Sequence, residues 1–390
     1  NLITTGEMRD NQMKLAASSR VIVNAGTVTY NEDHERLEIR GATEAVIYVS
    51  AATDYEDNYP TYRTRETDEQ VLARAQRDVD GATAKGYDKV KADHEADYKN
   101  IYDRVKLNLG QTKPDLANDD LLAAYNASNS TLTESEKRYC EQLLFQYGRY
   151  LQISSSRENA EGRDDQDLPA NLQGVWSIYD GAVGNVPWGA DYHMNVNMQM
   201  NYWPTYSANM AECAIPMIDY EDGLREPGRV TASTYFGIDN SDGKQNGYTA
   251  HTQNTPFGWT CPGWAFSWGW SPAAVPWMLQ NVYEYYEYGQ DVDYLKEKIF
   301  PMMDEQAKLY EQILTEITYD NGKTRLATAP SYSAEHGPYT AGNVYENTLY
   351  WQLFNDCCEA AEAINAKYPN TVSAERIAKW QDIMDKLDPI

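Results

Sequence analysis

Apolar side chains recur at helical spacing from about residue 134 to the end of the chain, which limits this part to a largely helical fold. Three stretches place them along one helical face: residues 135–151, 293–317 and 349–364. Long loops rich in Gly, Pro and Trp, such as residues 222–272, join these helices. Helical hairpins with elaborate loops at one end predict an (α/α) six-hairpin toroid. The pattern indicates about six or seven helices where such a ring needs twelve, so we expect an incomplete toroid.

Two residues carry local signals within these helices. Ser135 is predicted to be the N-cap of the helix in residues 135–151. Pro301 is predicted to kink the helix in residues 293–317, because a proline inside a helix removes a backbone hydrogen bond.

The N-terminal part has a different pattern. Residues 1 to about 55 contain β-branched runs separated by Gly, Asn and Asp, which predicts three or four strands. Two solvent-facing linker helices are predicted between residues 66 and 104. We therefore predict three parts: the C-terminal part of a β-sandwich domain in residues 1–60, a helical linker in residues 61–115, and the first part of the toroid in residues 116–390.

Composition excludes several classes of function. The 33 Lys and Arg against 59 Asp and Glu give a formal charge of −26, which repels nucleic acid and anionic membrane surfaces. No run of about 18 apolar residues is present to span a membrane, and the first residues lack the features of a signal peptide. The five cysteines show no metal-binding spacing, so we expect neither a metal nor a cofactor. The 31 Tyr and 10 Trp suit sugar binding, although Tyr-rich helices packing a large core would explain them equally well.

The stretch DYHMNVNMQMNYWPT, residues 191–205, alternates polar and apolar side chains. The polar set is Asp191, His193, Asn195, Asn197, Gln199 and Asn201, and the apolar set is Tyr192, Met194, Val196, Met198, Met200 and Tyr202. This alternation predicts an extended chain with one polar face. Buried amides are costly unless every donor and acceptor is matched, so the row indicates a surface that binds a polar ligand. The competing hypothesis is a set of buried amides that pair with protein groups.

Titratable residues near these loops are further candidates. Glu335 lies in the Pro-bounded loop TAPSYSAEHGP, where shielding would raise the carboxyl pKa and make it a general acid. The competing hypothesis is that Glu335 is one more solvated acidic residue. Asp180 and Asp191 are either ligand contacts or loop caps, of which we favour caps. His336 has no assigned role, and His251 is expected to bond backbone groups.

Several long motifs resemble one family. These are QISSSRENAEGRDDQDLPANLQGVWS, PWGADYHMNVNMQMNYWP and APSYSAEHGP, together with ATEAVIYVSAATDY and HEADYKNIYDRVKLNLG in the N-terminal parts. They resemble glycoside hydrolase family 95, the inverting 1,2-α-L-fucosidases and relatives that act on α-L-galactosides. The resemblance implies a hydrolase with a six-hairpin toroid that acts on fucosylated oligosaccharides or glycoconjugates. It also implies a bacterial protein that is secreted or periplasmic.

The resemblance also implies residue roles. Glu335 corresponds to the acid, Asn195 and Asn197 to the pair that positions the attacking water, and His193 to a fucose contact. An amide is too weak a base to remove a proton alone, and the family's activating Asp lies downstream of the region matched here. We therefore expect this chain to turn over fucosides negligibly without further polypeptide of the same enzyme. Asp191, otherwise a substrate contact, is the first candidate if the chain supplies its own base.

Departures from the family pattern concern substrate preference. Ala334 stands where the family usually has Pro, and SWGWSPAAVPW replaces a more Gly-rich stretch, so the subsite assigned to Trp268 and Trp270 is expected to differ. An α-L-galactosidase is the second enzyme hypothesis, since pockets discriminate one added CH₂OH group weakly unless they hydrogen-bond it. Two hypotheses without catalysis are a glycan-binding toroid and a purely structural toroid. An acid loop opposite an amide row favours the enzyme.

Overall fold

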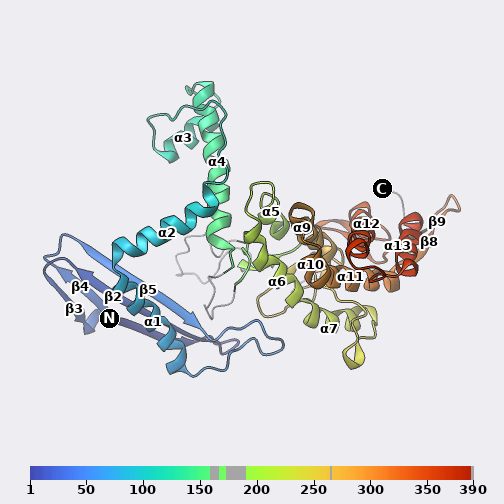
Figure 1. The fold of residues 1–390 in the computed structure, drawn as a ribbon, viewed down its shortest axis with the longest axis horizontal. Coiled ribbons are helices and arrows are strands. Elements are labelled where there is room, and N and C mark those ends of the chain that lie inside the picture. The colour runs from blue at the N-terminus through green and yellow to red at the C-terminus, as the bar shows by residue number, and fades with distance from the viewer. Residues whose placement is uncertain (159–166, 173–189, 264–265, 388–390) are drawn as a thin grey trace. The chain divides into compact units, whose positions relative to one another are not determined.

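The structure is a computed structural model of residues 1–390 (Figure 1). It describes residues 1–158, 167–172, 190–263 and 266–387. Internal contacts divide the described chain into two compact units, the first comprising residues 1–101 and the second the described residues from 102 onward.

The first unit contains five strands and a helical segment. The strands are β1 (Leu2–Glu7), β2 (Lys14–Val23), β3 (Thr27–Asn31), β4 (Arg36–Arg40) and β5 (Ala45–Thr53), and the helices are α1 (Asp68–Lys85) and α2 (Tyr87–Tyr102). An antiparallel sheet has the order β1-β2-β5, while β3 and β4 form a separate hairpin. The prediction of three or four strands missed β1, in which Thr and Gly replace the expected apolar alternation.

Helix α1 is not the solvent-facing linker that its composition predicted. Val71, Ala75 and Val79 recur at helical spacing along one face and are buried, and α1 contacts β2 and β5. On β5 the residues alternate between partly covered and exposed, so that Ile47 and Val49 lie on the exposed side. One face of α1 is therefore part of the small core of this unit.

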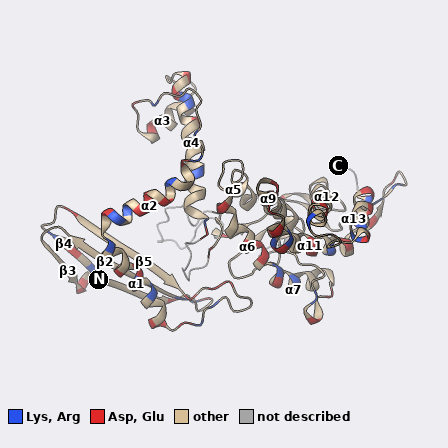
Figure 2. Cartoon of the chain, viewed as in Figure 1, with Lys and Arg blue, Asp and Glu red and all other residues tan. Residues whose placement is uncertain are grey.

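Charged residues of both signs lie along α2 and α13 (Figure 2). On α2, Lys89 pairs with Asp93 and Lys91 with Glu95, each four residues apart on one helical face. Such exposed pairs contribute little to stability but keep a helical surface hydrated.

Among the described residues, no helix combines the length and the apolar character needed to cross a membrane.

The second unit is mostly helical. Its helices are α3 (Asn118–Asn126), α4 (Glu134–Ser155), α5 (Asn197–Tyr202), α6 (Ile215–Gly223), α7 (Arg225–Phe236), α8 (Phe266–Gly269), α9 (Ala274–Gly289), α10 (Val292–Tyr294), α11 (Phe300–Ile313), α12 (Val344–Lys367) and α13 (Ala374–Lys386). Its strands form three two-stranded antiparallel pairs: β6 (Tyr192–His193) with β7 (Gln253–Asn254), β8 (Thr315–Thr318) with β9 (Thr324–Ala327), and β10 (Ser331–Ser333) with β11 (His336–Thr340).

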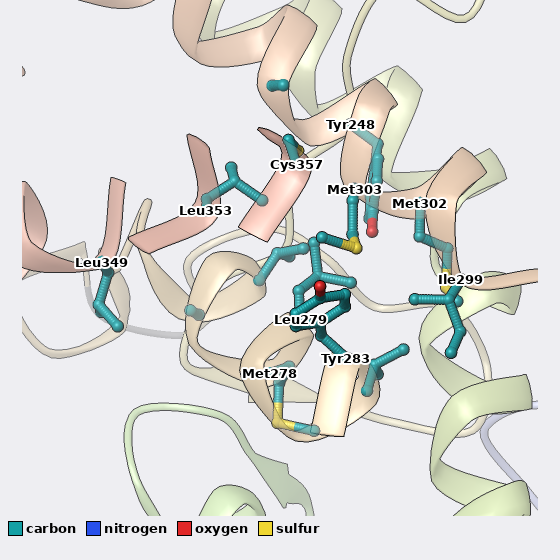
Figure 3. Close-up of a cluster of buried hydrophobic side chains, with 14 of the residues drawn as sticks. Tyr248, Met278, Leu279, Tyr283, Ile299, Met302, Met303, Leu349, Leu353 and Cys357 are labelled. Atoms are coloured by element: carbon teal, nitrogen blue, oxygen red, sulfur yellow. The ribbon is translucent and has the colours of Figure 1, made fainter. Parts of the chain in front are cut away.

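The core of this unit lies where α9, α11 and α12 pack against one another (Figure 1). Figure 3 shows part of this core, with side chains from α9, the turn Leu295–Ile299, α11, α12 and the loop that carries Tyr248. Met278 and Leu279 of α9 and Met302 and Met303 of α11 are almost completely buried there. Burying a side chain of this size contributes roughly 1.5–3 kcal/mol, so the three helices form a rigid support for the loops at their ends.

Two helix boundaries differ from the sequence prediction. Thr133, not Ser135, is the N-cap of α4, because its hydroxyl and the Glu136 side chain form a reciprocal capping box. The predicted helix over residues 293–317 ends at Ile313, and Ile317 lies in β8. A π-helical turn at Leu295–Ile299 directly precedes α11, and Pro301 is the second residue of α11, where a proline is accommodated.

The predicted loop 222–272 contains α7. The Gly and Pro content of this stretch indicated a loop, but Pro227 lies in the first turn of α7, where proline is tolerated. Gly228 lets α7 approach the backbone, because a Cβ there would lie 2.9 Å from the carbonyl oxygen of Thr249. Arg225 and Arg229 of α7 both donate hydrogen bonds to the carboxylate of Glu305 on α11, which is buried.

The extended chain predicted for residues 191–205 is wrong. Only Tyr192 and His193 are in a strand, and the chain then turns into α5. The turn is held by a hydrogen bond of 2.7 Å from Gln199 Nε2 to the carbonyl oxygen of Met194. Apolar residues at 194, 198 and 202 are four apart, so the same pattern that alternates along a strand also gives a buried helical face.

Candidate active site

A hairpin carries Glu335. Strands β10 and β11 pair with a β-bulge, and Glu335 lies in the short turn between them. Its φ is +59°, in the left-handed region that residues other than glycine rarely adopt. Such a conformation costs on the order of 1–3 kcal/mol and persists only where the surroundings impose it. The hairpin therefore holds the Glu335 carboxyl in a position that the backbone alone would not choose.

The base of this hairpin closes through backbone groups. The N–H of Gly342 donates to the carbonyl oxygen of Thr328 at 3.0 Å. Gly342 has a φ of +64°, and a Cβ there would lie 2.8 Å from the Cβ of Ala327. Glycine is therefore required where the chain returns from the hairpin to α12.

The segment around Asn195 forms the facing wall. Tyr192 pairs with Asn254 and His193 with Gln253, and the N–H of Met194 donates to Thr252 at 2.7 Å. These backbone bonds stop at residue 194, so Asn195 lies in the turn before α5. The turn directs a polar side chain away from the core that Tyr192 and Met194 enter.

The two segments meet at a cavity of about 360 Å³. The described residues that line it are Leu172, His193, Asn195, Val196, Asn197, Ala334 and Glu335. Asn195 Nδ2 donates a hydrogen bond of 2.9 Å to Glu335 Oε1. The volume is in the range of small-ligand sites. The cavity thus gathers Glu335, both asparagines and His193, which the sequence predicted as one site.

Asn195 and Glu335 are in direct contact, although a catalytic pair would need room for a sugar ring and a water between them. At 2.9 Å nothing fits between these two atoms. The Glu335 side chain is 50% exposed and not tightly packed, so it can turn away from Asn195 without losing buried contacts. Asn195 Oδ1 is buried and has no hydrogen-bond partner among the described residues. The amide therefore has an unused acceptor beside the cavity.

Asp191 orients His193 and is not among the described residues that line the cavity. Both oxygens of Asp191 lie within hydrogen-bond distance of His193 Nδ1, at 3.0 and 3.1 Å. A carboxylate only accepts, so it fixes the proton on Nδ1 and leaves Nε2 on the side of Glu335. Nε2 lies 4.0 Å from Glu335 Oε1, which is too long for a hydrogen bond. The Asp191 side chain is only 9% exposed, which suits positioning of the imidazole rather than ligand contact.

The two tryptophans assigned to a subsite are not among the described lining residues. Trp268 is 61% exposed, and Trp270 is 4% exposed. The Trp270 ring stacks on His251, with ring centroids 4.7 Å apart. The resemblance to the family assigned both residues to a subsite, but the turn after α8 places Trp270 in the interior.

His251 bonds the backbone, as predicted. Its Nδ1 accepts a hydrogen bond of 3.1 Å from the N–H of Ser271. Burial lowers the pKa of His251 to about 3, so the ring stays neutral.

Asp180 lies outside the described residues, as do parts of the motifs over residues 152–177 and 187–204. In the described part of the chain, no group of three or more His, Cys, Asp or Glu side chains is placed to hold a metal ion.

Sequence reasoning missed the residues that support the hairpin. Glu346 on α12 accepts hydrogen bonds from Ser331 and from the backbone of Tyr332. Asn343 is the N-cap of α12 and accepts from the N–H of Glu346 at 2.8 Å. The spacing of Asn343 and Glu346 is a helix-start signal that could have been found in the sequence. That signal would have placed a helix here, but it would not have connected Glu346 to the acid loop.

The arrangement combines one carboxyl group, two amides and one oriented imidazole in a small polar cavity. A carboxyl group can donate a proton, and amides can hold a water or hydroxyl groups without ionising. Together with the helical architecture, this site defines a mostly helical domain with a small polar ligand cavity.

Comparison with known proteins specifies the family. The model of the glycosyl hydrolase family 95 catalytic domain matches residues 86–390. The chain therefore belongs to glycosyl hydrolase family 95, which confirms the resemblance of its motifs.

Individual relatives agree with this family. A protein named probable alpha-fucosidase A, from Aspergillus niger, is 28% identical over 370 residues, covering 89% of this chain and 43% of the relative. A protein named alpha-L-fucosidase 2, from Arabidopsis thaliana, is 28% identical over 328 residues, covering 83% of this chain and 36% of the relative. The chain thus spans less than half the length of these two relatives.

A solved structure supports the fold. It is described as "Putative kojibiose phosphorylase from human microbiome", has a TM-score of 0.61 and 11% identity, and the match covers 99% of this chain and 46% of that chain. At this identity the likeness concerns the fold alone. It confirms the predicted class, a mostly helical toroid preceded by strands.

Proposed function

We propose that the protein that contains this chain is an exo-acting glycoside hydrolase that removes terminal α-1,2-linked L-fucosyl residues from glycans with inversion. The observation that carries the proposal is the cavity in which Glu335 faces Asn195, Asn197 and His193. Family membership and the names of the two relatives support the substrate class.

In this mechanism Glu335 is the general acid. It donates its proton to the leaving-group oxygen as the glycosidic bond breaks. Because Glu335 Oε1 accepts from Asn195 in the unliganded cavity, substrate entry must replace this hydrogen bond. The half-exposed carboxyl group then turns toward the glycosidic oxygen, and the Asn195 amide becomes available to the water.

Asn195 and Asn197 hold the attacking water on the other side of the sugar. The unpaired Oδ1 of Asn195 is an acceptor for one water proton. An amide cannot remove that proton, so inversion needs a carboxylate as well, at roughly 6.5–9.5 Å from the acid. Glu335 is the only carboxyl group on the described cavity wall. We assign the activation of water to a carboxylate beyond this wall, and Asp191 remains bound to His193.

The first experiment compares leaving groups in the full-length gene product. Glu335→Gln is expected to lower kcat on 2′-fucosyllactose by about two to four powers of ten. The loss on α-L-fucosyl fluoride should be much smaller, because fluoride needs little protonation to leave. His336→Gln, in the same hairpin but outside the described lining, is the matched control and should leave both rates near those of the parent. Equal losses on both substrates for Glu335→Gln would refute the acid assignment.

A second set of measurements tests substrate and stereochemistry. The first-formed sugar, followed by NMR, should be the β-anomer. Faster turnover of an α-L-galactoside than of the matching fucoside would instead favour the α-L-galactosidase. Binding without turnover would favour a glycan-binding module.

Asp191→Asn is expected to weaken substrate binding through a misoriented His193. Complete loss of fluoride hydrolysis in this variant would show that Asp191 is the base.

We also propose that the protein works outside the cell or in the periplasm, where the fucosylated oligosaccharides or glycoconjugates that we expect as its substrates are displayed. Fractionation of the source cells with activity assays tests this location, and activity confined to the cytoplasm would contradict it.

A further inference from the structure

We propose that Glu346 is a positioning residue for the acid: its buried carboxyl group ties the hairpin that carries Glu335 to the first turn of α12. The inference rests on the proposed function of Glu335. Glu346 is not among the described residues that line the cavity, so we assign its effect on catalysis to the hairpin that it bonds.

Glu346 receives hydrogen bonds from both ends of the segment that leads to Glu335. Its Oε2 accepts from the hydroxyl of Thr328 and, at 2.7 Å, from the hydroxyl of Ser331. Its Oε1 accepts from the N–H of Tyr332 at 2.9 Å. Tyr332 is three residues before Glu335, so these bonds fix strand β10, which ends two residues before the acid.

The rest of the Glu346 environment comes from α12. The Tyr350 hydroxyl, one turn further along the helix, donates to Oε2 at 3.1 Å. Glu346 is fully buried, and each of these four partners is a donor, which suits a carboxylate that can only accept. Burial raises the pKa of the Glu346 carboxyl group, and the hydrogen bonds from Thr328, Tyr332 and Ser331 oppose that rise.

A bonding pattern different from a standard capping box makes this role possible. Glu at the third helical position normally accepts from the backbone N–H of the N-cap residue. Here the N–H of the N-cap Asn343 donates instead to Ser331 Oγ at 3.0 Å, and Asn343 Nδ2 donates to the same oxygen at 2.6 Å. The Glu346 carboxyl group is therefore free to bind the hairpin, and Ser331 connects the helix cap to it.

A fixed hairpin matters because Glu335 occupies a strained left-handed conformation and its side chain is half exposed. Few contacts of its own hold it, so the placement of its carboxyl group depends on the strand below. A shift of about 1 Å in a reacting group can lower a rate by roughly 100-fold. Loosening the hairpin should thus reduce proton donation while other interactions with the sugar persist.

The test uses the ratio of kcat on α-L-fucosyl fluoride to kcat on 2′-fucosyllactose, measured on the full-length gene product. Glu346→Gln places an amide NH₂ group, itself a donor, against the hydrogen-bond donors of the hairpin. It should therefore lower kcat on 2′-fucosyllactose by about 10- to 100-fold with little change in KM. The rate on the fluoride should fall much less, so that the ratio rises. Thr328→Val removes one donor at similar volume and should raise the ratio in the same direction. Thr328→Ser restores the hydroxyl and should return the ratio to that of the parent.

Two further variants separate the outcomes. Glu221→Gln changes another buried carboxyl group that does not contact the hairpin, and it should leave the ratio unchanged. If Glu335→Gln raises the ratio but Glu346→Gln and Thr328→Val lower both rates equally, Glu346 is merely structural and the inference fails. If Glu335→Gln itself does not raise the ratio, the proposed acid is wrong and the inference fails with it.

Discussion

The buried carboxyl group of Glu221 gives a pH-dependent prediction for stability. Glu221 on α6 is completely buried, and its one described partner is the Tyr248 hydroxyl, which donates to Oε1 at 3.3 Å. Its Oε2 has no hydrogen-bond partner among the described residues. Burial, with a smaller contribution from the neighbouring Asp222 charge, raises the pKa of Glu221 from 4.5 to about 8.

The sign of the effect follows from proton binding. At a pH below the pKa of the unfolded chain, the carboxyl group is protonated in both states, so it adds no pH dependence to the free energy of unfolding. As pH rises toward 8, the unfolded chain loses this proton while the folded chain keeps it, so the free energy of unfolding falls. At 1.36 kcal/mol per pKa unit the full loss is between about 2 and 5 kcal/mol, the lower figure allowing for relaxation around the charge.

Glu221→Gln removes the titrating group and should therefore stabilise the protein increasingly from pH 5 to pH 8. All ten tryptophans follow residue 102, so Trp fluorescence during urea unfolding reports on the second unit. The difference in free energy of unfolding between variant and parent should grow by at least about 2 kcal/mol over this range. Glu362→Gln, at an exposed position on α12, is the control and should show no such growth. A difference for Glu221→Gln that is the same at both pH values would refute the reasoning.

Two further predictions concern packing in the same unit and use the same urea assay. Glu305→Gln leaves two partly buried arginines without their carboxylate and should lower the free energy of unfolding by about 3–5 kcal/mol. Asp382→Asn, which breaks an exposed ion pair on α13, should change it by less than about 1 kcal/mol, and similar losses in both variants would contradict this. Gly228→Ala places a Cβ 2.9 Å from the carbonyl oxygen of Thr249 and should destabilise by about 1–3 kcal/mol. Gly148→Ala, in open space on α4, should stabilise by about 0.5–1 kcal/mol, so a loss there would mean that helix propensity does not decide its effect.

Local patterns were sufficient where one period dominated a long segment. The apolar stripes predicted α4 and α12, because side chains every three to four residues can only share a face in a helix. The motifs predicted the family, and with it the helical toroid. They also selected Glu335, Asn195, Asn197 and His193, which the structure brings to one cavity.

Local patterns failed where two periods coincide or where a distant contact decides. Residues 194, 198 and 202 fit both a strand face and a helix face, and in the structure the chain forms α5 from Asn197, with Gln199 bonded to Met194. The Gly and Pro content of residues 222–272 indicated a loop, yet Gly228 is needed for α7 to approach Thr249. In the first case the local pattern fits a strand and a helix equally well. In the second case the contact that decides is with Thr249, which is 21 residues away from Gly228 in the sequence.

The sequence by itself determined the chemical character of the candidate site, because carboxyl, amide and imidazole groups have fixed donor and acceptor properties wherever they lie. The tertiary structure alone decided how they meet. Asn195 and Glu335 are 140 residues apart and bond directly, Asp191 turns from the cavity to hold His193, and Trp270 packs inside against His251. Glu346 reaches the hairpin that carries Glu335 only because α12 packs against β10. Such contacts depend on the free energy of the whole packed core, which no short stretch of sequence contains.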